Sequence, residues 1–158
     1  MYTMKKSFKR KKGPVQSKKV THDGIKFASG LEKYMYIALK KAKIKADYEG
    51  QTFELVEAFD FNLKSVERQG NGKGEYRDRG NKKIQNIKYT PDFIGSDFII
   101  ETKGRANESF PMRWKLFKKL LTHKNMITQK PIEWTLYKPQ NQKECDETIR
   151  LILLQQNT

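Results

Sequence analysis

The sequence predicts an α/β fold in which a mixed β-sheet is flanked by helices, with its elements in the order α-β-β-β-α-β-α. Three observations support this class. Apolar residues recur at helical spacing in three separate segments. Short aromatic and β-branched runs lie between these segments. The chain has 158 residues, enough for one domain with a continuous core, so a second full domain is not expected.

The first helix is predicted to run from Ser29 to about Lys45. Ser29 and Glu32 form an S-x-x-E capping box, which satisfies backbone N–H groups at a helix start. Asp47 and Gly50 then close the segment in a turn. The apolar residues of the segment share one face: Leu31, Tyr34, Met35, Ala38, Leu39 and Ala42. The predicted helix is therefore amphipathic.

Two strands are predicted next, at residues 52–61 and 84–89. The first is aromatic and β-branched with partial alternation, which is typical of a strand with one face in water. The second should end at Pro91, because proline has no N–H to donate to a β-ladder. Between them, residues 64–83 hold four glycines among many charges, which predicts a mobile insertion, the flexible and basic tip of a hairpin.

The remaining elements are a third strand, a second helix, a last strand and a C-terminal helix. Residues 98–103 form a short apolar strand that ends in charged residues. Pro111 opens the second helix, in which an inward apolar face lies opposite a basic stripe that includes Arg113, Lys115 and Lys118. Residues 132–137 form the last strand, and the C-terminal helix follows Pro139.

The charge of the chain favours a polyanionic partner, with nucleic acid as the first candidate. The formal net charge is +15, from 33 Lys and Arg against 18 Asp and Glu. No apolar run approaches the ~20 residues needed to span a bilayer, and the N-terminus lacks the apolar segment of a secretory signal. A soluble, cytoplasmic protein is expected, with the lone Cys145 as a buried or idle thiol.

The first 20 residues carry eight cations and no acid, so they form a basic arm ahead of a domain at residues 21–158. Such a block is expected to be disordered alone and to lie along phosphates when DNA is present. The residues expected to bind DNA are Lys9, Arg10, Lys11 and Lys12 of the arm and Arg113, Lys115 and Lys118 of the second predicted helix. The alternative is a tail that only increases solubility.

Three residues carry the candidate chemistry: Asp92, Glu101 and Lys103. Glu101 and Lys103 are two apart on a strand, so their side chains leave the same face. A turn at Gly95 and Ser96 would pair this strand with the preceding one and bring Asp92 beside Glu101. Two carboxylates in one site favour a hard cation such as Mg²⁺, and Lys103 suits a phosphodiester substrate. The alternative is a turn aspartate beside a solvated charge pair.

Two sequence segments resemble the signature of PD-(D/E)xK nucleases. They read Tyr-Thr-Pro-Asp-Phe at residues 89–93 and Ile-Glu-Thr-Lys-Gly at residues 100–104, and are especially similar to the phage endonuclease I family of Holliday-junction resolvases. That family also places a glutamate on its first helix within Ser-Gly-Leu-Glu, which matches residues 29–32. The resemblance covers about residues 24–121; the basic arm and the insertion at residues 64–83 have no clear counterpart in it.

The resemblance implies a restriction-endonuclease-like core and a set of metal ligands. Asp92, Glu101 and the carbonyl of Thr102 would hold the metal, and Glu32 would be a second-metal ligand or would orient water. Mg²⁺ is the implied cofactor, with Mn²⁺ as a substitute, and no small-molecule cofactor is expected. The capping box is an alternative explanation of Glu32.

The implied function is a metal-dependent endonuclease that cuts branched DNA as a Holliday-junction resolvase of phage or mobile-element origin. By analogy with the family it would be a homodimer in the host cytoplasm. Two alternatives stay open. One is a restriction- or repair-type nicking endonuclease on duplex DNA. The other is a non-catalytic DNA-binding protein that contacts phosphates through its cations.

Overall fold

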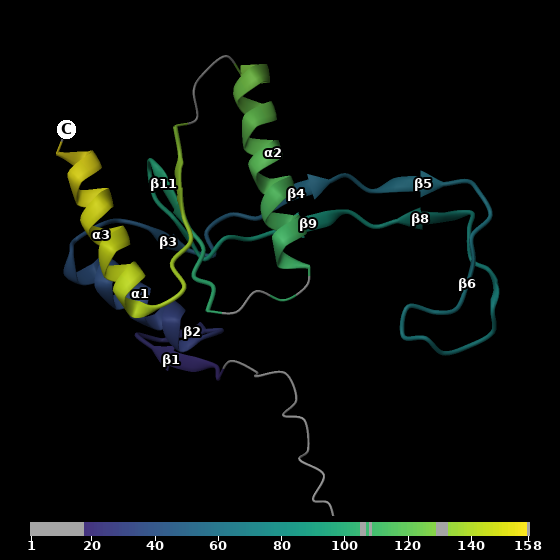
Figure 1. Ribbon diagram of the computed structural model, residues 1–158, viewed down its shortest axis with the longest axis horizontal. Helices are drawn as coiled ribbons and strands as arrows, with labels where there is room; N and C mark the ends of the chain where they lie inside the picture. Colours follow the sequence, from purple (N-terminus) through teal and green to yellow (C-terminus); the bar gives the residue numbers. More distant parts are fainter. Residues whose placement is uncertain (1–17, 105–106, 108, 129–132, 158) are drawn as a thin grey trace, which may run out of the picture.

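The computed structural model describes residues 18–104, 107, 109–128 and 133–157 (Figure 1). It is a mixed α/β structure with several small sheets. Its helices are α1 (Gly30–Lys41), α2 (Phe110–Thr128) and α3 (Gln142–Gln156). None of the described helices is long and apolar enough to cross a membrane. The predicted α/β class is therefore confirmed in this coarse form.

The largest sheet has four short strands in the order β12-β11-β10-β3. They are β3 (Asp47–Tyr48), β10 (Phe93–Ile94), β11 (Phe98–Ile100) and β12 (Thr135–Tyr137). β10 runs antiparallel to both β3 and β11, whereas β12 runs parallel to β11. α2 provides the crossover between β11 and β12, which a parallel pair requires. The sheet is thus mixed, as predicted.

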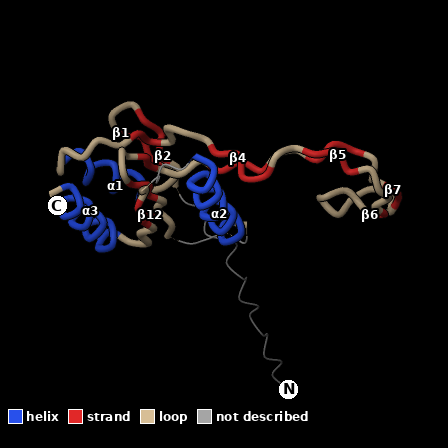
Figure 2. Tube along the Cα trace, turned by 90° about the horizontal axis from the view of Figure 1, so that it is seen from above, coloured by secondary structure: helices blue, strands red, loops and turns tan. Residues whose placement is uncertain are grey.

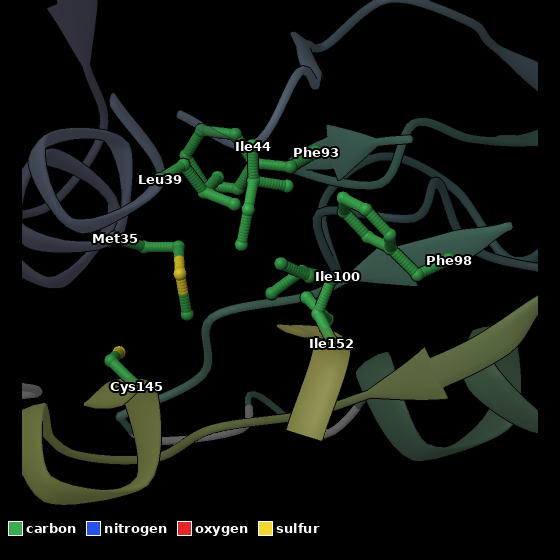
Figure 3. Packing of buried hydrophobic residues seen from close by; sticks show 8 residues of the cluster. All are labelled: Met35, Leu39, Ile44, Phe93, Phe98, Ile100, Cys145 and Ile152. Carbon is green, nitrogen blue, oxygen red and sulfur yellow. The ribbon is translucent and has the colours of Figure 1, made fainter. Parts of the chain in front are cut away.

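Alternate residues of β11 enter two hydrophobic clusters on opposite faces of this sheet. Phe98 and Ile100 pack in a cluster with Met35 of α1 and Ile152 of α3 (Figure 3). Ile99 points the other way, into a cluster with aromatic residues of α2. All three β11 side chains are buried, because helices cover both faces. Cys145 lies in the first cluster, which confirms a buried thiol, and burial raises its pKa to about 12.

The first helix begins as predicted but ends earlier. Ser29 is the N-cap, and its hydroxyl accepts a hydrogen bond from the Glu32 N–H at 3.2 Å. The predicted end near Lys45 is wrong, because Ala42 is the C-cap and Lys43 adopts a left-handed φ of +57°. Ile44 nevertheless reaches the core from beyond the helix.

A small hairpin precedes α1 and was not predicted. It pairs β1 (Val20–His22) with β2 (Ile25–Phe27). Asp23 and Gly24 form its turn with φ values of +50° and +76°. An Asp-Gly pair is a strong hairpin signal, so the sequence did contain the necessary information. Phe27 is fully buried, and its ring contacts Tyr36 and Tyr48.

Residues 53–89 form a long two-stranded antiparallel ribbon that reaches away from the sheet and helices (Figures 1 and 2). From the root outward, β4 pairs with β9, β5 with β8, and β6 with β7. The strands are as follows: β4 (Phe53–Val56), β5 (Phe59–Phe61), β6 (Val66–Glu67), β7 (Arg77–Asp78), β8 (Lys82–Ile84) and β9 (Ile87–Tyr89).

The ribbon corrects three predictions about strands. The strand predicted at residues 52–61 is divided into β4 and β5. Residues 64–83, predicted as the mobile tip of a hairpin, do form the end of an antiparallel ribbon but contain paired strands. The strand predicted at residues 84–89 pairs with β4 and not with β11. These pairings join residues distant in sequence, so local patterns carry little information about them.

We predict that Gly95→Ala destabilises the fold. A Cβ at Gly95 would lie 2.3 Å from the ring of the buried Phe98, which has no open space to enter. Overpacking of this kind costs about 1–3 kcal/mol. Gly70→Ala is the control, because no atom lies within 4 Å of its added Cβ. Thermal unfolding checks the difference, and equal melting temperatures for the two variants would contradict it.

Candidate active site

The antiparallel pair β10–β11 brings the two candidate carboxylates together. Phe93 pairs with Ile100, so the next position along the ladder sets Asp92 opposite Glu101. The backbone of Glu101 is also fixed from the other side, where its N–H donates to the Tyr137 carbonyl at 2.9 Å. Lys103 N–H likewise donates to the Pro139 carbonyl at 2.9 Å. β11 ends at Ile100, so the prediction that Glu101 and Lys103 lie on a strand is wrong, and these two hydrogen bonds hold the chain beyond it.

A polar cleft of about 370 Å³ opens over this edge of the sheet. Five of the residues predicted to form the site line it: Glu32, Asp92, Glu101, Lys103 and Arg113. They come from α1, the β10–β11 region and α2, which are far apart in sequence. The cleft therefore gathers the separate motifs at one place.

Asp92 is held by one of its oxygens. Its Oδ2 accepts hydrogen bonds from the Thr102 N–H at 2.7 Å and from the Thr102 hydroxyl at 2.6 Å. Desolvation by burial, followed by the negative charge of Glu101, raises the pKa of Asp92 to about 8. The Thr102 hydrogen bonds lower the pKa and only partly offset these effects.

Glu101 is buried, with 3 % of its surface exposed, and both of its oxygens are engaged. The Tyr89 hydroxyl donates to Oε2 at 2.6 Å, and Lys103 Nζ contacts Oε1 at 3.2 Å. Desolvation by burial raises the pKa of Glu101 despite these two partners. Lys103 Nζ also lies 4.6 Å from the centre of the Phe110 ring, so the ammonium is positioned by two contacts.

Glu32 faces the cleft from the N-terminus of α1. Its carboxylate accepts hydrogen bonds from the Ala28 N–H, the Ser29 hydroxyl and the Tyr48 hydroxyl, at 2.7–2.9 Å. The capping box predicted from sequence is therefore present. Its charge also raises the pKa of both Asp92 and Glu101, so it acts on the same site. Capping and a role in the cleft are compatible.

Comparison with known protein families places the chain in one family. A family described as proteins of unknown function, DUF1064, matches residues 10–135. The chain belongs to the DUF1064 family. The comparisons with curated proteins and with solved structures found no match.

The DUF1064 match spans all the candidate site residues and the whole ribbon, and it ends at the start of β12. The helix α3 lies beyond it. The cleft and the ribbon are thus features of the family segment of the chain.

The carboxylates of the described residues do not already form a cluster of three or more metal-binding side chains. Each carboxylate instead contacts donor groups of the protein. Asp92 accepts hydrogen bonds from Thr102, and Glu101 contacts Tyr89 and Lys103. Glu32 accepts hydrogen bonds at the start of its own helix. The chemistry of the pair nevertheless fits a hard cation. Glu101 is buried and Asp92 is half-buried, the charge of Glu101 raises the pKa of Asp92, the charge of Glu32 raises the pKa of both, and oxygen ligands suit Mg²⁺.

The predicted DNA-binding cations have different locations in this DUF1064 chain. Arg113 lines the cleft, and its Nη1 donates to the Lys88 carbonyl at 3.2 Å. Lys115 and Lys118 are exposed on α2 and are not among the residues that line the cleft. Lys118 Nζ lies 5.6 Å from the centre of the Trp114 ring. Lys9, Arg10, Lys11 and Lys12 lie outside the described residues.

Three hydroxyl groups of the site had no role predicted from the sequence. Tyr89 and Tyr48 each donate to a candidate carboxylate, and Thr102, predicted to bind metal through its carbonyl, donates its side-chain hydroxyl to Asp92. Tyr89 and Thr102 belong to the two motif segments, so their positions were a usable signal. Nothing in the local sequence distinguishes Tyr48.

We predict that Asp92→Asn stabilises the metal-free protein at pH 8 but not at pH 4. Folding raises the Asp92 pKa from 3.8 to about 8, so the folded state keeps a proton that the unfolded chain releases across this window. Stability therefore falls as the pH rises from about 4 to 8. Asparagine keeps an acceptor for Thr102 without the charge. The expected gain at pH 8 is on the order of 1–3 kcal/mol.

Thermal unfolding in a chelator, at several pH values, measures this effect. Asp60→Asn is the control, because Asp60 is an exposed carboxylate on the ribbon. A difference in stability between Asp92→Asn and wild type that stays constant from pH 4 to 8 would contradict a raised pKa of Asp92 in the folded protein.

Proposed function

We propose that this DUF1064 chain is a divalent-metal-dependent endodeoxyribonuclease of the PD-(D/E)xK type. One observation carries the proposal: Glu32, Asp92, Glu101 and Lys103, picked out by three separated motifs, line a single cleft. The alternative in which Glu101 and Lys103 form a solvated pair fits poorly, because Glu101 is buried. A buried acid pair beside a lysine is typical of a functional site.

The finer fold assignment, a restriction-endonuclease-like core, belongs to this proposal. It is supported by a mixed sheet with α1 and α3 on one face and α2 on the other. The candidate carboxylates lie at an antiparallel strand pair in its middle. The sheet itself is built from other strands than predicted, because the strands predicted at residues 52–61 and 84–89 lie in the ribbon and β3 and β10 take their places.

The proposed metal ligands are Asp92, Glu101 and the carbonyl of Thr102, with Glu32 as a further ligand or as the residue that orients the attacking water. A bound Mg²⁺ or Mn²⁺ ion supplies Lewis-acid polarisation of a phosphodiester. The side chains of the protein would position the metal ligands and stabilise the charge that develops during the reaction. Tyr89 and Thr102 hold the two carboxylates in place, and Lys103 stabilises the extra negative charge as water attacks phosphorus and the P–O bond breaks.

Positively charged side chains that line the cleft are suited to contact the phosphates of DNA. Lys88 and Arg113 line the cleft together with Lys103, so a phosphate backbone entering it meets three positive side chains. The overall charge of +15 adds a long-range attraction for DNA.

The proposed substrate is branched DNA, with the four-way Holliday junction as the preferred form. This choice rests on the resemblance to phage endonuclease I, as do the homodimer, the phage or mobile-element origin and the host cytoplasm as location. A nicking endonuclease on duplex DNA would use the same cleft and would cut linear duplex equally well. A non-catalytic binding protein would cut neither substrate.

We predict that Glu101→Gln abolishes cleavage and leaves DNA affinity at fixed salt largely unchanged. Glutamine keeps an acceptor for Tyr89 but removes the charge, so the loss in rate should be at least about 100-fold. Glu147→Gln on α3 is the control. The assay compares a four-way junction with a matched linear duplex in Mg²⁺. Undiminished cutting by Glu101→Gln would remove Glu101 from the mechanism.

A further inference from the structure

The outer part of the ribbon, from β5 to β8, does not pack against the described sheet and helices and so does not contribute to their core. Figures 1 and 2 show it projecting from the sheet and helices, and only its root strands β4 and β9 approach α2. Large apolar side chains on it are exposed: Phe59 at 49 %, Leu63 at 67 %, Val66 at 50 % and Tyr76 at 69 %. An exposed apolar surface of this kind marks a binding surface.

Hydrogen bonds define the conformation of the ribbon tip. The Asp78 carboxylate accepts from the Ser65 and Gly80 N–H groups at 3.0 and 2.9 Å. The Arg79 guanidinium donates to the carbonyls of Glu67 and Glu75 at 3.1 and 3.2 Å. At Gly80, a Cβ would lie 1.9 Å from the Leu63 carbonyl oxygen, so only glycine fits. The ribbon tip therefore has a defined conformation that its own hydrogen bonds hold.

The ribbon tip is strongly basic, and several of its cations are unused. Residues 64–83 contain seven Lys and Arg against three Asp and Glu. Arg68, Arg79 and Lys82 make hydrogen bonds or an ion pair within the ribbon. The side chains of the other four are exposed and have no hydrogen-bond or ion-pair partner among the described residues: Lys64, Lys73, Arg77 and Lys83.

The ribbon starts at the candidate active site. Lys88, Tyr89 and Thr90, at the end of its returning strand, line the cleft. From Val56 to Val66 the chain spans at most about 33 Å at ~3.3 Å per residue, close to one turn of B-DNA. A ribbon of this length that starts at the cleft is long enough to follow a duplex arm whose backbone lies in the cleft.

We propose that the ribbon lies in the groove of a duplex arm next to the scissile phosphate. The major groove admits a two-stranded β-ribbon, and Lys64, Lys73, Arg77 and Lys83 supply phosphate contacts. The exposed apolar side chains meet base edges and sugars. This inference rests on the proposed function and adds to it a second DNA contact that sets how much duplex must flank the cut.

A second copy of the chain is the competing occupant, and the charges disfavour it. In a two-fold symmetric contact the same patch meets itself, so the unpaired cations of two ribbons would face each other. Like charges placed together oppose association. DNA is the partner whose charge complements the ribbon tip.

The test compares two variants, each of which neutralises four exposed cations. The ribbon variant carries Lys64→Gln, Lys73→Gln, Arg77→Gln and Lys83→Gln. The control carries Lys41→Gln, Lys43→Gln, Lys45→Gln and Lys143→Gln, on or next to α1 and α3. Binding of a four-way junction and of a duplex is measured without added Mg²⁺ or Mn²⁺ across a salt series, together with hydroxyl-radical footprinting, the melting temperature and sedimentation.

The ribbon variant should lose about two to four units from the slope of log affinity against log salt, because each phosphate contact contributes about one. Its footprint should shorten on one side of the cleft, while the control keeps the wild-type footprint at the same net charge. A ribbon variant that matches the control in slope and footprint would overturn the inference, as would one that changes only the oligomeric state.

The experiments distinguish an error in the proposed nuclease function from an error in the proposed groove contact. A wild-type protein that binds DNA but cuts neither substrate in Mg²⁺ contradicts the nuclease proposal and leaves the footprint comparison valid. Wild-type cutting combined with an unaltered ribbon variant contradicts only the groove contact.

Discussion

The site depends on two carboxylates, the half-buried Asp92 and the buried Glu101, that the β10–β11 ladder places opposite each other. Asp92 and Glu101 cannot move apart, because the pairing of Phe93 with Ile100 fixes their spacing and α1, α2 and α3 cover the sheet on both faces. Neighbouring hydroxyls and Lys103 only partly compensate, and the pKa of both acids stays raised. A fold that maintains such a pair accepts a cost in stability, which is typical of sites under functional constraint.

Local patterns in the sequence were sufficient to predict much of the fold and the central residues of the site. The capping box marks the start of α1, and apolar periodicity locates α2 and α3. The alternation of Phe98, Ile99 and Ile100 between two buried faces follows from an uninterrupted apolar run. The Pro-Asp and Glu-x-Lys segments identified the residues that line the cleft, since short motifs retain their residue types and spacing in the sequence.

The features that the sequence did not predict depend on contacts between distant residues. Strands of two to four residues have too few positions for a clear pattern, so the pairing of Phe53 with Tyr89 and of Phe59 with Ile84 was not foreseen. Glycines in the insertion indicated a loop, although Gly80 is required by close contact with Leu63. Tyr48 reaches Glu32 only because β3 joins the sheet beside β10. The DUF1064 match covers these features without giving them a function.

The most direct test of the account is the affinity of the free protein for Mn²⁺ at pH 8, measured by calorimetry in wild type, Asp92→Asn, Glu101→Gln and the control Asp60→Asn, whose carboxylate is exposed and lies outside the cleft. If the paired carboxylates form a cation site, wild type and Asp60→Asn should bind with the same affinity, and each site variant should bind at least about tenfold more weakly, because a carboxylate ligand is lost. Equal affinity in all four proteins, or no binding by wild type, would contradict the account.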